Sequence, residues 1–171
     1  TDVADSIPHH EYTVAAGSII GHQAVQGVLT VAIVRDNDGL KDVPSSSSRG
    51  PSDIDHPVVE SRDKPDVAAL DCVELMSAGG VQQTVCGASA AAAQVAAIAA
   101  LLIEANPDLT VQQVSDVLTS TASASAAGDM QSRLGLVDPV AALNAARGGM
   151  KPIVASEIDR LETATAQAVI E

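Results

Sequence analysis

Residues 87–105 read GASAAAAQVAAIAALLIEA, and this stretch decides the fold. It carries no charge before Glu104, and Ala, Val, Ile and Leu dominate it. The composition predicts a helix from Ser89 to Ala105, roughly 25 Å long. Because apolar side chains lie all round its axis, we expect a buried core helix. Polar Ser89 and Gln94 argue against a membrane span.

Two short apolar runs precede this helix and indicate an α/β fold. Val28–Val34 and Lys64–Leu70 are rich in β-branched or small apolar residues, which predicts buried strands of a parallel sheet. The segment 35–57 between them is rich in Ser, Asp, Gly and Pro, and its composition predicts a loop.

Helix signals follow the long apolar stretch. Thr110 and Gln113 form a capping box for a second helix. Asp138 and Pro139 predict the start of a third helix, which we expect to end near Arg147. We therefore divide the chain into a domain at 1–149 and an appended amphipathic helix or tail at 150–171.

The composition narrows the class of protein. The chain has 171 residues, 46% of them hydrophobic, with neither Phe nor Trp, so Ala, Val, Leu and Ile must build the core. The 22 acidic and 9 basic residues give a net charge of −13, which repels nucleic-acid phosphates and anionic membranes. We expect no nucleic-acid partner, no membrane partner, no metal and no cofactor. Cys72 and Cys86 lack zinc-site spacing and are either free thiols or one disulfide.

Ser89 is the candidate reactive residue of the chain. A serine at the start of a helix lies close to backbone N–H groups and the positive end of the helix dipole, which would stabilise an oxyanion. A serine in this position is also a common N-cap. The segment 87–92 by itself leaves both interpretations open.

Five ordered segments together resemble the subtilisin-like serine peptidases (subtilases, peptidase S8 family). They are Ser47-Ser48-Arg49-Gly50-Pro51, Lys64-Pro65-Asp66-Val67-Ala68, Gly87-Ala88-Ser89-Ala90-Ala91-Ala92, Ala105-Asn106-Pro107-Asp108-Leu109-Thr110 and Gly135-Leu136-Val137-Asp138. The resemblance covers about residues 17–147 and implies the C-terminal half of the catalytic domain. It further implies a parallel sheet, Ser89 as nucleophile, a polypeptide substrate and export from the cytoplasm.

The sequence also departs from the family pattern at three positions near these motifs. Ala88 replaces the usual threonine before the nucleophile, Ala93 replaces a proline, and Ser46 replaces an aromatic residue. The family's oxyanion asparagine follows an Ala-Ala-Gly stretch. Here Ala15-Ala16-Gly17 is followed by Ser18, which makes Ser18 a candidate oxyanion-hole residue unless the asparagine lies upstream of Thr1.

The family's aspartate and histidine motifs, Asp-Thr/Ser-Gly and His-Gly-Thr, do not occur in this sequence. We expect the four histidines to be surface or structural residues: His9, His10, His22 and His56. A serine without a base is nearly inert, so we expect this chain alone to be inactive.

Two hypotheses remain for the function. The first is a serine endopeptidase region whose aspartate and histidine come from another segment. The second is a non-catalytic structural or binding module of subtilase descent. Half of a parallel sheet exposes an apolar edge, so we expect the chain to pair with a missing N-terminal half or with itself.

Overall fold

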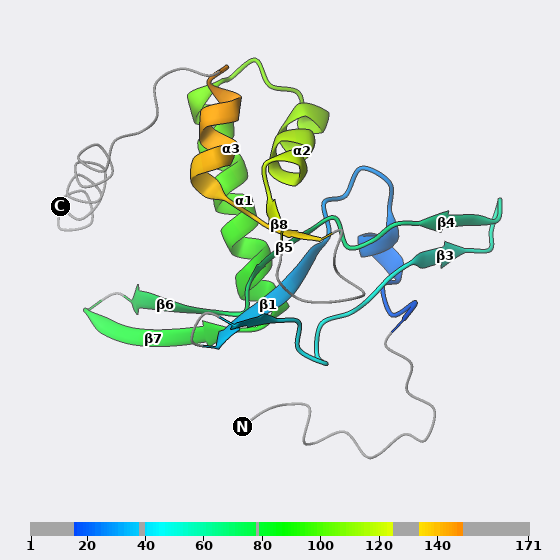
Figure 1. The fold of residues 1–171 in the computed structure, drawn as a ribbon, viewed down its shortest axis with the longest axis horizontal. Coiled ribbons are helices and arrows are strands. Elements are labelled where there is room, and N and C mark those ends of the chain that lie inside the picture. Colours follow the sequence, from blue (N-terminus) through cyan, green and yellow to red (C-terminus); the bar gives the residue numbers. More distant parts are fainter. Residues whose placement is uncertain (1–15, 38–39, 78, 125–133, 149–171) are drawn as a thin grey trace.

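The computed structural model describes residues 16–37, 40–77, 79–124 and 134–148, and these form a mixed sheet packed against helices (Figure 1). The elements in chain order are η2 (Gly21–Ala24), β1 (Val31–Asn37), β2 (Leu40–Asp42), β3 (Ser52–Ile54), β4 (Glu60–Arg62), β5 (Val67–Leu70), β6 (Cys72–Ser77), β7 (Val81–Cys86), α1 (Ala88–Ala105), α2 (Val111–Ser120), β8 (Ser123–Ala124), β9 (Gly135–Leu136) and α3 (Pro139–Ala146). The predicted α/β class is confirmed.

The main sheet has five strands in the order β2-β1-β5-β9-β8. Its three central strands, β1, β5 and β9, are parallel, with Val31 opposite Val67 and Ala68 opposite Leu136. The edge strands β2 and β8 pair antiparallel with their neighbours. The predicted parallel sheet is therefore correct for the centre, and its two edges are antiparallel.

The first predicted strand is shifted along the chain. It was expected at residues 28–34, and β1 runs instead from Val31 to Asn37. Side-chain hydrogen bonds occupy the backbone just before it, because Lys64 Nζ donates to the Val28 carbonyl and Asp66 Oδ2 accepts from the Thr30 N–H. The strand then extends past residue 34 because β2 pairs with its far end.

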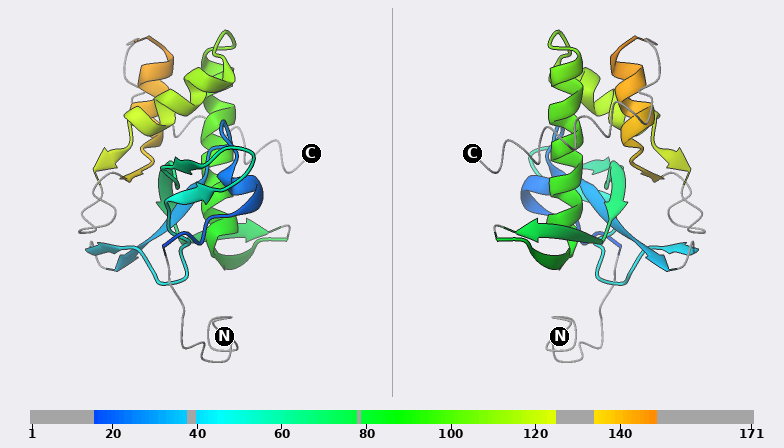
Figure 2. Two further views of the ribbon diagram at one scale, coloured as in Figure 1. Left: turned by 90° about the vertical axis from the view of Figure 1, so that its right-hand side faces the viewer. Right: turned by 90° about the vertical axis from the view of Figure 1, so that its left-hand side faces the viewer.

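The core lies on both faces of the sheet, as the alternation of side chains along a strand requires. Ile33 on β1 and Val67 and Ala69 on β5 point to the face covered by the three helices. Ala32, Val34 and Ala68 point to the other face; they pack with Leu134, Leu136 and Val43. All the helices α1 to α3 thus lie over one face (Figure 2).

Helix α1 has the predicted bounds to within one residue, but its predicted burial on all sides is wrong for the described chain. Its buried side chains form one stripe: Ala90, Ala91, Val95, Ile98 and Leu102. Leu101 and Ile103 are 48% and 49% exposed. The described residues cover α1 on the sides that face the main sheet, the other two helices and the strands β6 and β7, and its remaining side stays open.

Helix α1 is also the one described helix long and apolar enough to cross a membrane, with 18 residues and a mean hydropathy of 1.7. Core helices of globular proteins meet the same criterion. Helix α1 packs on β1 and β5, and 28% of this apolar stretch is buried among the described residues.

The caps of the other two helices are confirmed. Thr110 accepts from the Gln113 N–H, and the Gln113 side chain accepts from the Thr110 N–H, which completes the capping box of α2. Asp138 Oδ1 accepts from the Ala141 N–H at 2.9 Å, and Pro139 is the first residue of α3. Helix α3 ends at Ala146 with Arg147 as its C-cap.

Two hairpins outside the main sheet were not predicted from the sequence. Strands β3 and β4 pair antiparallel, and β2 and β3 both lie within the segment expected to be loop. Strands β6 and β7 form a second hairpin that projects from the body of the molecule (Figure 1). Strand β7 is exposed along its whole length, so no alternation of buried and polar residues marks it in the sequence.

Two sets of expectations lie outside the described residues. These are the amphipathic tail at 150–171 and the surface or structural roles expected for His9 and His10.

Candidate active site

A cavity of about 440 Å³ lies beside the N-terminal end of α1. Its wall includes Ser18 and the adjacent isoleucines, the segment leading into β1, and the serine run at 46–48. Ala88, Ser89 and Ala92 of α1 form another part of the wall. Apolar walls with a few hydroxyl groups are typical of a substrate pocket.

Ser89 is the second residue of α1 and is exposed. The N-cap of the helix is Gly87, with φ +105°, so the alternative of Ser89 as N-cap is wrong. The Gly87 carbonyl accepts from the N–H groups of Ala90 and Ala91, which starts the helical ladder. Ser89 therefore lies in the first turn, where the positive end of the helix dipole acts.

Ser18 lies on the wall of the same cavity as Ser89. Its backbone and side chain pair with one residue, because the Ser18 N–H donates to the Arg49 carbonyl at 3.0 Å and Ser18 Oγ accepts from the Arg49 N–H at 2.9 Å. The Ser18 hydroxyl also lies 3.4 Å from the Arg49 carbonyl oxygen. This pairing fixes the position of the Ser18 loop against residues 47–51.

The Ser-Ser-Arg-Gly-Pro segment connects the cavity wall to the sheet. Ser47 is buried, and its Oγ accepts from the Ile33 N–H of β1. Gly50 lies against the backbone of Lys64, where a Cβ atom would come within 1.9 Å of the carbonyl oxygen. Just beyond the motif, Ser52 Oγ donates to the Ile19 carbonyl at 2.7 Å. The motif therefore holds the loop 18–20 in place.

The Lys-Pro-Asp segment holds the other side of the cavity. Lys64 Nζ, with a side chain only 7% exposed, donates to Asp66 Oδ2 at 2.7 Å. The same carboxylate oxygen accepts from the Thr30 N–H at 2.6 Å. The segment 28–31, which lines the cavity, is thus fixed at both its first and its third residue.

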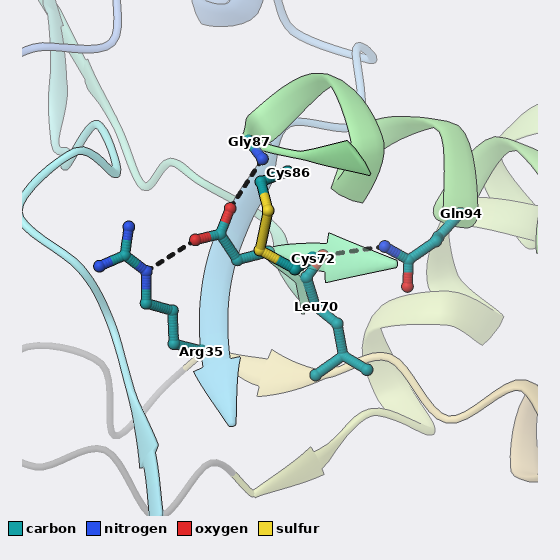
Figure 3. The surroundings of a disulfide bond; sticks show 7 residues. Arg35, Leu70, Cys72, Cys86, Gly87 and Gln94 are labelled. Carbon is teal, nitrogen blue, oxygen red and sulfur yellow. Dashed lines mark hydrogen bonds and ion pairs between the residues drawn. A yellow bond between two sulfur atoms is a disulfide. The ribbon is translucent and has the colours of Figure 1, made fainter. Parts of the chain in front are cut away.

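Three consecutive residues at the end of β5 and just after it, Leu70 to Cys72, are bonded to residues in α1 and immediately before it (Figure 3). Leu70 accepts from Gln94 Nε2 at 2.8 Å, Asp71 Oδ1 accepts from the Gly87 N–H at 2.7 Å, and Cys72 is joined to Cys86 by a disulfide. The disulfide settles the alternative left open for the two cysteines. Both described cysteines are paired.

Asp71 is a residue that the sequence analysis missed. Its side chain is 4% exposed, and its second oxygen accepts from Arg35 Nε at 2.7 Å. The available signal was its place directly after a buried strand, because functional side chains of α/β proteins gather at the carboxyl ends of parallel strands.

The two described histidines lie away from Ser89. His22 lies in η2, His56 follows β3, both are exposed, and neither lines the cavity. Among the described residues that do line it, none is a histidine or a carboxylate. In the described ranges, no group of three or more His, Cys, Asp or Glu side chains could hold a metal.

Comparisons with known proteins identify the family of the chain and a similar fold. The sequence model of the subtilase family, peptidase S8, matches residues 11–137. Among solved structures, a protease from Pseudoalteromonas arctica PAMC 21717 is similar, with 25% sequence identity and a TM-score of 0.52. The match covers 73% of this chain and 38% of that protease chain. Comparison with curated protein sequences gives no significant match.

Proposed function

Because this chain belongs to the subtilase family of serine peptidases, we propose that it hydrolyses peptide bonds with Ser89 as the nucleophile. The observation that carries the proposal is that Ser89 and Ser18, far apart in the sequence, line one cavity. Those are the two positions at which the family motifs would place a nucleophile and an oxyanion-hole donor. A polypeptide substrate would lie in this cavity with its scissile carbonyl between them.

The position of Ser89 in the first turn of α1 suits this role. An oxyanion formed at the attacked carbonyl would lie near the positive end of the helix dipole, which stabilises negative charge. A Ser18 hydroxyl would donate a hydrogen bond to the same oxygen. Because Ser18 Oγ already contacts the Arg49 backbone, it would have to turn its proton from Arg49 toward the substrate.

The proposal requires a base for the Ser89 hydroxyl. A serine attacks efficiently only when an imidazole takes its proton and a carboxylate orients that imidazole. We place both groups outside the residues that line the described cavity, on a segment that complements this chain. This chain alone is then expected to react slowly.

The complementing segment also accounts for the uncovered apolar surface. Leu101 and Ile103 of α1 are about half exposed. The chain spans 38% of the similar protease chain, which leaves most of that fold without a counterpart here. The partner is therefore an N-terminal half of the peptidase domain, and self-association is the alternative. By analogy with the family, the complete protein would act outside the cytoplasm.

A non-catalytic role is the second candidate function. Ala88, Ala93 and Ser46 depart from the family pattern around the cavity, and the Ser18 side chain is already engaged by Arg49. A module that has lost catalysis would keep the cavity for binding a peptide or for packing alone.

Covalent labelling by a fluorophosphonate separates the two functions. The probe would be applied to this chain alone and to the chain together with whatever coding sequence precedes Thr1. We expect labelling in the longer form, its loss in Ser89→Ala, and its retention in Ser48→Ala, which removes another exposed hydroxyl from the same cavity wall. A folded, unlabelled longer form would favour the non-catalytic module.

A further inference from the structure

Asp71 is a buried carboxylate that the proposed chemistry does not use. It stands at the end of β5, with its side chain 4% exposed, beside the start of α1. Its Oδ1 accepts from the Gly87 N–H at 2.7 Å, and its carbonyl oxygen lies 3.1 Å from the same nitrogen. One N–H at the N-cap is therefore held by two oxygens of a single residue.

This contact acts on the backbone two residues before Ser89. Gly87 has no side chain to cap the helix, and its φ of +105° gives it a backbone conformation that other residues rarely adopt. Its carbonyl begins the helical ladder by accepting from Ala90 and Ala91. Fixing the Gly87 peptide therefore fixes the direction of the first turn of α1 relative to the β6–β7 hairpin. The position of Ser89 in that turn is fixed with it.

The neighbouring contacts act on the same segment from both sides. The Cys72–Cys86 disulfide holds the residue before Gly87, and Gln94 Nε2 is bonded to the Leu70 carbonyl two turns further along (Figure 3). Among these, only the Asp71 contact carries a charge. A negative charge beside a helix N-terminus would oppose the field that stabilises an oxyanion at Ser89.

Arg35 offsets that charge. Its Nε lies 2.7 Å from Asp71 Oδ2, on the oxygen that does not contact Gly87. Because the Asp71 carboxylate is almost fully buried, the pair is poorly screened by solvent on that side. The two oxygens thus have separate partners, one positioning the helix and one neutralising the charge.

The geometry points to Asp71 as a positioning residue for Ser89, with Arg35 as the counter-charge that keeps the helix field available to the oxyanion. This inference rests on the proposed role of Ser89 as nucleophile. It predicts that Asp71 sets the rate of attack rather than the binding of the substrate.

The test measures fluorophosphonate labelling rates, and kcat and KM on a peptide substrate, in the longer form of the protein. Asp71→Ala should lower the labelling rate and kcat by about 10- to 100-fold with little change in KM, because the nucleophile is misplaced. Asp71→Asn, which keeps the acceptor for Gly87, should recover most of that rate. Asp138→Ala is the matched control, since it removes a carboxylate–amide contact of the same kind at α3 and should leave the rate unchanged.

Arg35 variants test the electrostatic part. Arg35→Met should lower the labelling rate by about two- to fivefold, and adding Asp71→Asn should reverse that loss because no charge then needs an offset. These variants keep the inference testable if Asp71→Ala does not fold. A wild-type rate in Asp71→Ala, or in Arg35→Met where Asp71→Ala does not fold, would overturn the inference.

Amide hydrogen exchange distinguishes this inference from the proposed function. If the wild-type protein is not labelled, the proposed function fails, and the positioning role is measured on the backbone alone. Faster exchange of the Gly87, Ala90 and Ala91 amides in Asp71→Ala, with the Ala142 amide of α3 unchanged, would support positioning. Unchanged exchange at all of these amides would overturn it.

Discussion

Cys72 and Cys86 lie directly opposite one another across β6 and β7, with their Cα atoms 4.1 Å apart and their sulfur atoms bonded. The two residues close the base of a hairpin whose strands are otherwise largely exposed. Asp71 comes just before this base and Gly87 just after it. The disulfide therefore joins the end of β5 to the start of the helix that carries Ser89.

Removing this disulfide should destabilise the fold, because the unfolded chain then gains conformational entropy. The double variant Cys72→Ala, Cys86→Ala should lower the free energy of unfolding by about 2–4 kcal/mol, the range expected when a short loop is no longer cross-linked. Both cysteines are exposed, so little packing is lost. Urea denaturation measures the effect. Reductant should lower wild-type stability by a similar amount and leave the double variant unchanged; equal stability of all forms would contradict the prediction.

The capping box of α2 should contribute measurably to stability. Thr110→Ala removes the acceptor of the Gln113 N–H, and the free energy of unfolding should fall by about 0.5–2 kcal/mol. Thr119→Ala is the control, because its exposed hydroxyl donates to the Ser115 and Asp116 carbonyls, one turn earlier in the same helix, and caps neither end. Chemical denaturation of both variants gives the comparison, and equal losses would argue against the box.

Gly50 should be intolerant of any side chain. A Cβ atom there would lie 1.9 Å from the Lys64 carbonyl oxygen and 2.9 Å from its carbonyl carbon, so two backbone segments would have to separate. Gly50→Ala should lower the free energy of unfolding by about 1–3 kcal/mol. The exposed neighbour Ser48 provides the control, since Ser48→Ala should change stability by less than about 0.5 kcal/mol. Thermal unfolding of the two variants measures both changes in stability. Equal stability of Gly50→Ala and Ser48→Ala would contradict the prediction.

The ion pair between Glu60 and Arg62 should make a small pH-dependent contribution to the free energy of unfolding. The hydrogen bond from Arg62, more than the charge itself, lowers the pKa of the Glu60 carboxyl below its usual value. A lowered pKa in the folded state stabilises the fold above the unfolded pKa, and this contribution is lost as the pH falls through the folded value. The stability advantage of wild type over Glu60→Gln should therefore shrink between about pH 5 and pH 3.

Salt provides the control for that pair. The Glu60 side chain is exposed and the Arg62 side chain is partly exposed, so high ionic strength should reduce the advantage of wild type at neutral pH as well. An advantage of wild type that grew on acidification would contradict the assignment.

Local sequence signals predicted the helices well. The apolar run 89–105, the Thr110 capping box and the Asp138-Pro139 start all produced helices at the expected places. Helix ends depend on hydrogen bonds between residues three or four positions apart, which the sequence displays directly. Both predicted parallel strands were also found: β1 lies three residues further along the chain than the predicted 28–34, and β5 covers only Val67–Leu70 of the predicted 64–70.

The hairpins, the one-sided burial of α1 and the contact of Asp71 with Gly87 were decided by the tertiary structure. Each depends on which distant segments meet: α1 is open on one side because its contacts with the described strands and helices leave Leu101 and Ile103 about half exposed. Ser18 and Ser89 likewise line one cavity only because the fold brings their two segments together. The sequence by itself determined the helix caps and the family motifs, because these are local patterns. Packing between remote segments determined the surroundings of Ser89, because no local pattern specifies the partners of a buried side chain.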